Sequence, residues 1–249
     1  MSITPRLAAL AVPLLLVGGA LTGCGVSDGP QVRPGVAAEV DGTTIELSDV
    51  DDTVAGTCAY LDDADGALPF PRVTVRRLLV ETLVRETAAE RLLDELDAEL
   101  PDTYAPAVAS IDQNYADAPD DQAAAMRAGD TSSTYVALAS DAIGNTLLRE
   151  ETGAEPGNPE EIRARGTQAI ADWLADHDVD LNPTYGLRID DGSFVADDGL
   201  SVPVSDGAVF NQGVAGFDIS GQDEELQTKI QQASAQLSDD QVCGTRTAG

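Results

Sequence analysis

Apolar residues recur every three to four positions through most of residues 49–177, a spacing typical of amphipathic helices. The longest such pattern covers residues 72–99, and Pro101 and Pro106 end it. Its expected inward positions are Val75, Leu78, Leu79, Leu83, Leu92, Leu93 and Leu96. Further helices are expected over residues 49–61, 107–115, 120–128, 131–151 and 159–177. Ser48 and Asn158 are the expected caps of the first and the last of these helices.

Three short stretches have the composition of β-strands instead. Residues 36–40 and 43–47 flank Asp41 and Gly42, a strong hairpin signal because both turn positions need a positive φ. Residues 179–189 are also β-prone and are expected to return and pair with this hairpin. The sequence therefore predicts a mainly α fold with a small antiparallel sheet. From Asp190 onward we expect an irregular acidic tail with one short polar helix over residues 223–237.

The start of the chain has the architecture of a secretory signal peptide, with a short polar segment followed by an apolar run over residues 7–21. That run is shorter than the about 20 apolar residues that a membrane-spanning helix needs. It ends in a motif that resembles the bacterial lipobox, in which an aliphatic residue and two small residues precede a cysteine: Leu21, Thr22, Gly23 and Cys24. We expect removal of residues 1–23, acylation of Cys24 and a flexible linker over residues 24–35. The alternative is an ordinary signal peptide with a cysteine near its cleavage site.

An acyl chain on Cys24 would hold the protein on the extracytoplasmic face of the cell membrane, because each buried methylene contributes about 0.8 kcal/mol. Of the three cysteines in the chain, Cys58 and Cys243 then remain. An even pair of cysteines outside the cell favours a disulfide, although two unpaired thiols are the alternative. The bond would tie the tail to the first helix. It would also close a loop of most of the chain, for which the chain-entropy estimate is about 5 kcal/mol.

The chain is strongly acidic, with 44 acidic and 14 basic side chains and a net charge of −30. Nucleic acid is not an expected partner, because binding to phosphates needs a surface rich in lysine and arginine. Attraction to anionic headgroups through a basic patch is not expected for the same reason. The lipid is therefore the expected link to the membrane, and the acidity itself is typical of a well-solvated surface.

The sequence offers little for catalysis or metal binding. His177 is the only histidine, and it lies at the predicted end of a helix between Asp176 and Asp178, where an imidazolium suits the helix dipole. A capping or surface role is favoured over a role as a catalytic base. A zinc site is not expected, because there is no second histidine and no pair of closely spaced cysteines. We therefore expect a protein that is not an enzyme and that uses no cofactor or metal.

The predicted hairpin and the returning strand are the parts that resemble a known family. The segment VAAEVDGTTIELSDVD, residues 36–51, is similar to the opening of the SurA-like N-terminal chaperone domain, in which a hairpin enters a helix. The segment NPTYG, residues 182–186, is similar to the strand that closes this domain in SurA-like lipoproteins of actinobacteria, although Thr184 replaces the usual arginine. The resemblance implies a SurA-like helical domain over residues 36–189, followed by the tail over residues 190–249.

This resemblance implies transient binding of unfolded or newly exported proteins by apolar surfaces among the helices. In related foldases, a prolyl isomerase module of the parvulin type accompanies the domain and uses a pair of histidines. This chain has one histidine, so isomerase activity is not expected. The expected function is that of a non-catalytic, lipid-anchored chaperone or scaffold for exported proteins. The alternative is a surface interaction or solute-binding lipoprotein that reuses the same fold.

Overall fold

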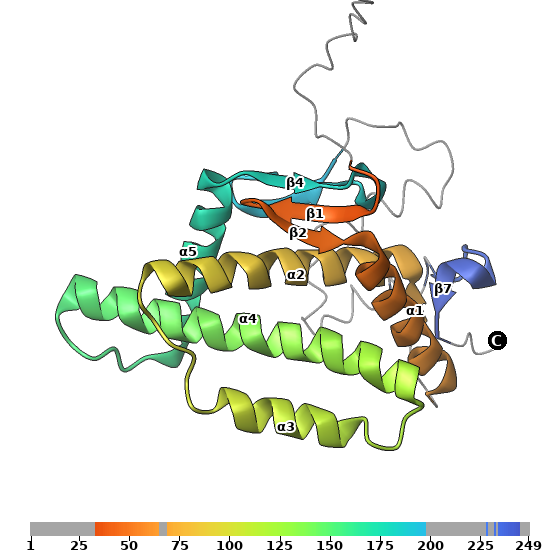
Figure 1. The fold of residues 1–249 in the computed structure, drawn as a ribbon, viewed down its shortest axis with the longest axis horizontal. Coiled ribbons are helices and arrows are strands. Elements are labelled where there is room, and N and C mark those ends of the chain that lie inside the picture. The colour runs from red at the N-terminus through yellow and green to blue at the C-terminus, as the bar shows by residue number, and fades with distance from the viewer. Residues whose placement is uncertain (1–32, 65–68, 198–227, 229–231, 233, 245–249) are drawn as a thin grey trace, which may run out of the picture.

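The computed structural model describes residues 33–64, 69–197, 228, 232 and 234–244. The described residues form a mainly helical fold with short antiparallel strands, as the sequence predicts (Figure 1). The signal peptide, the lipobox and Cys24 lie outside the described residues, as does most of the predicted polar helix over residues 223–237. Of the described residues in that segment, 228, 232 and 234 are helical, whereas residues 235–237 form a turn and a bend, so the helix does not reach residue 237 as predicted.

The helices follow one another along the chain in the order that the hydrophobic pattern predicts. Their bounds are Leu47–Asp63 for α1, Arg72–Glu95 for α2, Tyr104–Asn114 for α3, Asp120–Thr152 for α4 and Pro159–Asp176 for α5. The strands are β1 (Val36–Val40), β2 (Thr43–Glu46), β3 (Phe70–Pro71), β4 (Val179–Leu181), β5 (Leu187–Asp190), β6 (Ser193–Ala196) and β7 (Val242–Cys243). Two short 3-10 helices, η1 (Pro183–Tyr185) and η2 (Asp239–Gln241), precede β5 and β7.

A three-stranded sheet in the order β2-β1-β4 confirms the predicted hairpin and its pairing with a returning strand. Of the predicted returning segment over residues 179–189, only residues 179–181 pair with the hairpin, because residues 187–190 pair with β6 instead. Asp41 and Gly42 have φ angles of 44° and 77°, the positive values that a two-residue hairpin turn requires. Asn182, directly after β4, fixes the sheet edge, because its Nδ2 donates a hydrogen bond to the carbonyl oxygen of Val36 (2.8 Å). Its Oδ1 accepts one from the N–H of Thr184 (3.1 Å), which starts the turn into β5.

The helix α4 is the centre of the described fold and packs against α1, α2, α3 and α5. In Figure 1 it lies between α3 on one side and α2 on the other, with the sheet β2-β1-β4 covering the far side of α2. The prediction of two separate helices over residues 120–128 and 131–151 is wrong, because α4 continues through Gly129 and Asp130. A glycine inside a helix costs about 1 kcal/mol, which packing along both sides of α4 outweighs.

The crossing of α4 and α5 depends on two glycines. A Cβ atom built on Gly144 of α4 would collide with the carbonyl oxygen of Ile162 on α5. A Cβ atom built on Gly166 of α5 would likewise collide with the carbonyl oxygen of Ser140 on α4. The two backbones approach closely because both positions lack a side chain. At the start of α5, Asn158 caps the helix as predicted, with its side chain accepting a hydrogen bond from the N–H of Glu160 (3.1 Å).

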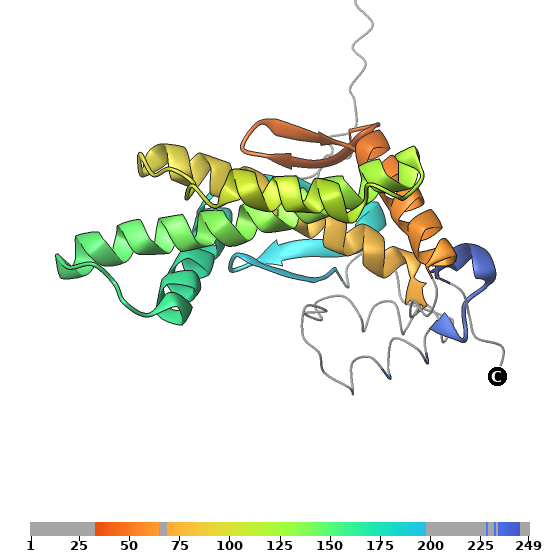
Figure 2. The same ribbon diagram turned by 90° about the horizontal axis from the view of Figure 1, so that it is seen from below.

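Several element boundaries differ from the prediction. The first helix begins at Leu47 with Glu46 in the capping position, so Ser48 is not its cap. The helix α2 ends at Glu95 rather than at residue 99, because Asp97 adopts a left-handed conformation with φ of 48°. The irregular tail was expected from Asp190, but β6 pairs with β5 around a turn at Asp191 and Gly192, so ordered structure continues to Ala196. Figure 2 shows this second hairpin in cyan beside the helices.

Candidate functional site

A wide groove of about 810 Å³ runs between α1, α2 and the first half of α4. The helix α2 contributes three of its apolar side chains, Val75, Leu78 and Leu79, and β3 and β6 each add a phenylalanine. The lining consists of Thr53, Thr57, Leu61, Phe70, Val75, Leu78, Leu79, Glu81, Thr82, Arg85, Ala125, Met126, Gly129, Asp130, Ser133, Thr167 and Phe194. We call this feature the apolar groove.

The groove lies along a face of α2 whose apolar side chains the described helices cover only in part. The sequence predicts that Val75, Leu78, Leu79 and Leu83 point into the core. Val75, Leu79 and Leu83 are half-buried and pack against core residues as predicted, whereas the prediction is wrong for Leu78, which lies outside the core cluster. The fully buried positions in this part of α2 are Val80 and Val84, on the neighbouring side of the helix. Because residues 78–80 are all apolar, the apolar face of α2 is wider than the core can cover.

Not all of the apolar lining side chains pack against the core. Leu79 and Val75 are half-buried but still pack against core residues, so they also stabilise the fold. Leu78 on α2 and Met126 on α4 are half-buried and do not belong to the hydrophobic core cluster. Half-exposed apolar side chains that gather in one concave surface are typical of a binding site rather than of a structural contact. The hydrophobic pattern alone does not distinguish such residues from core residues.

The polar groups of the groove interact with one another. Glu81 and Arg85 form an ion pair one helical turn apart, with 3.8 Å between nitrogen and oxygen, and the Arg85 guanidinium lies 5.0 Å from the centre of the Phe194 ring. Asp130 accepts a hydrogen bond of 2.6 Å from the hydroxyl of Tyr115. Burial and this hydrogen bond raise the pKa of Tyr115, so the hydroxyl keeps its proton and remains a donor. The arrangement leaves apolar surface as the main feature that the groove presents.

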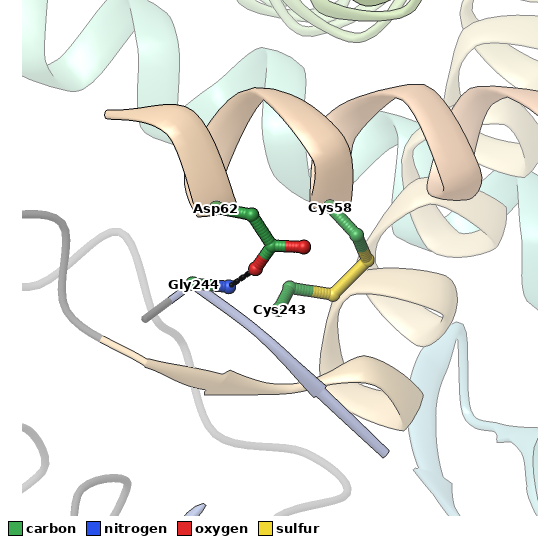
Figure 3. The surroundings of a disulfide bond; sticks show 4 residues. All are labelled: Cys58, Asp62, Cys243 and Gly244. Carbon is green, nitrogen blue, oxygen red and sulfur yellow. Dashed lines mark hydrogen bonds between the residues drawn. A yellow bond between two sulfur atoms is a disulfide. The ribbon is translucent and has the colours of Figure 1, made fainter. Parts of the chain in front are cut away.

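A disulfide joins Cys58 of α1 to Cys243 of β7, as Figure 3 shows. Beside it, the N–H of Gly244 donates a hydrogen bond of 2.7 Å to Oδ1 of Asp62, one turn after Cys58 on α1. The strand β7 pairs with β3, so that Cys243 lies opposite Phe70. Since Phe70 and Leu61 both line the groove, the bond holds the described end of the tail next to the groove wall.

The single histidine is part of a packed helix end. The ring of His177 stacks on the ring of Trp173, with 3.7 Å between centroids and 9° between planes. Its Nδ1 lies 2.7 Å from the carbonyl oxygen of Trp173, and Nε1 of Trp173 donates a hydrogen bond to Glu95 on α2 (2.9 Å). These contacts give His177 and Trp173 a role in joining the end of α5 to α2.

Two other kinds of feature are absent from the described residues. Within the parts of the chain that the structure describes, no three histidine, cysteine, aspartate or glutamate residues gather as they would around a metal ion. In the same parts, no helix combines the length and the apolar character that crossing a membrane requires.

Comparisons with known proteins give no relative: no family model matches the chain, and no curated protein or solved structure is significantly similar to it. The resemblance of residues 36–51 and 182–186 to the SurA-like family therefore stays a prediction. Any function has to be argued from the groove and its surroundings.

Proposed function

We propose that this protein is a non-catalytic chaperone or scaffold that holds apolar segments of unfolded, newly exported proteins in the apolar groove. The observation that carries this proposal is the groove itself, about 810 Å³ in volume and lined by half-exposed leucine, valine, phenylalanine and methionine side chains. A protein that needed only a stable helical fold would be more stable if these apolar side chains of α2 were fully buried. Each square ångström of apolar surface removed from water contributes about 25 cal/mol.

The composition of the groove suits many different apolar segments rather than one ligand. Met126 is unbranched and polarisable, so it adapts to side chains of different shape. Leu78 and Leu79 provide apolar surface without a fixed hydrogen-bonding pattern. Binding surfaces that must accept varied partners use such adaptable apolar contacts. Holding an unfolded segment in this way requires no chemical step.

The proposed place of action is the extracytoplasmic face of the cell membrane. The lipobox-like motif ending in Cys24 supports a lipid anchor there, and the disulfide between Cys58 and Cys243 suits an oxidising compartment. An anchored chaperone would meet exported chains where they emerge from the membrane. The resemblance to the SurA-like family supports the same function, without the isomerase activity of its parvulin-containing members.

Aggregation of a chemically unfolded protein, followed by light scattering, tests this proposal. The protein to use is residues 24–249 with Cys24→Ser, which keeps every residue that the structure describes. We expect it to slow aggregation, and we expect Leu78→Gln with Met126→Gln to weaken the effect at least severalfold. Leu138→Gln is the matched control, because Leu138 is half-buried on α4, outside the core cluster and outside the groove lining. Absence of any effect of the unsubstituted protein, together with no binding of unfolded peptide, would contradict the proposal.

A further inference from the structure

The apolar groove does not end at its last apolar side chain. A second hollow of about 530 Å³ adjoins it where α1 crosses the start of α4, and the two share Thr53 and Ala125 in their walls. The rest of the second hollow is lined by Asp52, Ala55, Gly56, Asp121 and Ala124. We call it the acidic pocket. It brings the carboxylates of Asp52 and Asp121 next to the mainly apolar groove.

The two helices approach closely here because of small residues. A Cβ atom on Gly56 would meet the Cβ of Ala125 and lie 2.9 Å from the carbonyl oxygen of Asp121. With no larger side chain between α1 and α4, Asp52 and Asp121 stand at the edge of the hollow, and both are exposed. The position of Asp121 in the first turn of α4 also suits the helix dipole.

No arginine of the described chain forms an ion pair with either carboxylate. Arg76 pairs with Asp51, the residue directly before Asp52 on α1. Arg85 of the groove lining pairs with Glu81 and lies over Phe194, and Arg127 pairs with Asp112. The whole chain also carries a net charge of −30, which attracts cationic groups at long range. A cationic group of a bound partner would therefore be complementary to this end of the groove.

From this geometry we infer that the groove and the acidic pocket together bind polypeptide segments in which apolar residues are followed by lysine or arginine. The inference rests on the proposed function, because it names the class of segment that the same groove takes. The apolar part lies along α2, and the basic side chain reaches past Thr53 and Ala125 toward Asp52 and Asp121. The two carboxylates extend the groove, and they do not form a binding site on their own.

The effect on affinity should be modest, because both carboxylates are exposed. An exposed ion pair changes an equilibrium by a factor of about 1.5 to 5. Two basic residues on a segment should therefore strengthen binding about three- to tenfold relative to glutamine at low salt. The preference should shrink as salt is added, since exposed charges are screened over about 10 Å at 0.1 M ionic strength.

Fluorescence anisotropy with three unstructured peptides tests the inference. The peptides share one apolar core of leucine and phenylalanine and carry two lysines, two glutamines or two glutamates after it. The protein is residues 24–249 with Cys24→Ser. We expect the lysine peptide to bind most tightly and the glutamate peptide most weakly. The preference is the ratio of the affinities for the lysine and the glutamine peptide. We expect Asp52→Asn with Asp121→Asn to reduce this ratio at least to its square root.

A matched control separates the pocket from the overall charge. Asp97→Asn with Asp102→Asn removes the same two negative charges from exposed positions outside both linings and should leave the preference unchanged. Equal binding of all three peptides, or a preference that survives in the Asp52 and Asp121 variant, would overturn the inference and leave the proposed function standing. Failure of all three peptides to bind would count against the proposed function itself, and the inference would fall with it.

Discussion

Cys58, in the middle of the first helix, is disulfide-bonded to Cys243, in the last strand that the structure describes. The two residues are 185 positions apart in the sequence, so the bond encloses nearly all of the described fold. It also places β7 against β3, where Phe70 is both the partner of Cys243 and part of the groove lining. The bond therefore contributes to stability and to the shape of the binding surface.

Removing this disulfide should destabilise the protein. For Cys58→Ala with Cys243→Ala, we expect the free energy of unfolding to fall by several kcal/mol, with about 5 kcal/mol as the chain-entropy estimate for a loop of this size. Urea denaturation of this variant and of the protein that keeps both cysteines measures the change. The Cys24→Ser substitution is the control, and it should leave the unfolding curve unchanged. Equal stability of the double variant, or two free thiols in the unreduced protein, would contradict the role given to this pair.

The close crossing of α4 and α5 predicts that Gly144 cannot carry a side chain without displacing a backbone. Gly144→Ala should lower the free energy of unfolding by about 1 to 3 kcal/mol, the usual cost of overpacking. Gly129→Ala on the same helix is the matched control, because its Cβ would have nothing within 4 Å. That control should be neutral or stabilising by up to about 1 kcal/mol, since alanine is the better helix former. Similar stability of the two variants in thermal or urea unfolding would show that the crossing is looser than described.

Glu86 on α2 gives the fold a predictable dependence on pH. Burial raises the pKa of this carboxyl, Glu90 raises it further, and a hydrogen bond from Ser132 partly opposes both. Because the folded-state pKa is above the unfolded value, the folded state loses relative stability as pH rises through the range between the two. Glu86→Gln should therefore stabilise the protein at pH 7, and the gain should disappear below the ordinary glutamate pKa of 4.5.

Urea denaturation of Glu86→Gln at pH 7 and at pH 4 measures this difference. Glu150→Gln, at an exposed position of α4, is the control for the loss of one negative charge. A gain from Glu86→Gln that is as large at pH 4 as at pH 7, or no gain at either pH, would show that burial of the charged carboxyl does not destabilise the fold.

The sequence was sufficient for those parts of the fold that local chemistry determines. Asp41 and Gly42 specify a tight turn whatever surrounds them, and the structure confirms the hairpin and its pairing with residues 179–181. Asp191 and Gly192 carry the same turn signal, with φ angles of 50° and 72°, yet the hairpin that they form was not predicted. The weak periodicity after Asp190 concealed it.

The groove could not be predicted, because it depends on which faces the helices leave uncovered. Periodicity identifies Leu78 as an apolar residue on a helix, and it gives the same description for the buried Val80. Only the packing of α1 and α4 around α2 separates the two. The single helix over residues 120–152 was missed for a related reason, since contacts along its length outweigh the low helix propensity of Gly129.

The lipid anchor stays a prediction of the sequence and has a direct test. We expect the protein to fractionate with membranes in the cell that produces it, and Cys24→Ser to release it into the soluble fraction, because the acyl chain would be its link to an anionic surface. If cleavage before Cys24 is blocked, residues 1–23 stay attached. The uncleaved protein should then differ from the cleaved one in electrophoretic mobility. Membrane retention of the Cys24→Ser protein after a wash with high salt would contradict the anchor.

The central claim is that the apolar groove receives unfolded polypeptide, and site-specific photo-crosslinking in the native cell envelope tests it most directly. A photoreactive residue is placed at position 78, inside the groove, or at position 138, at a half-buried position outside its lining. The account predicts crosslinks from position 78 to many different exported chains, and few from position 138. Equal crosslinking from both positions, or capture of one folded partner alone from position 78, would contradict it.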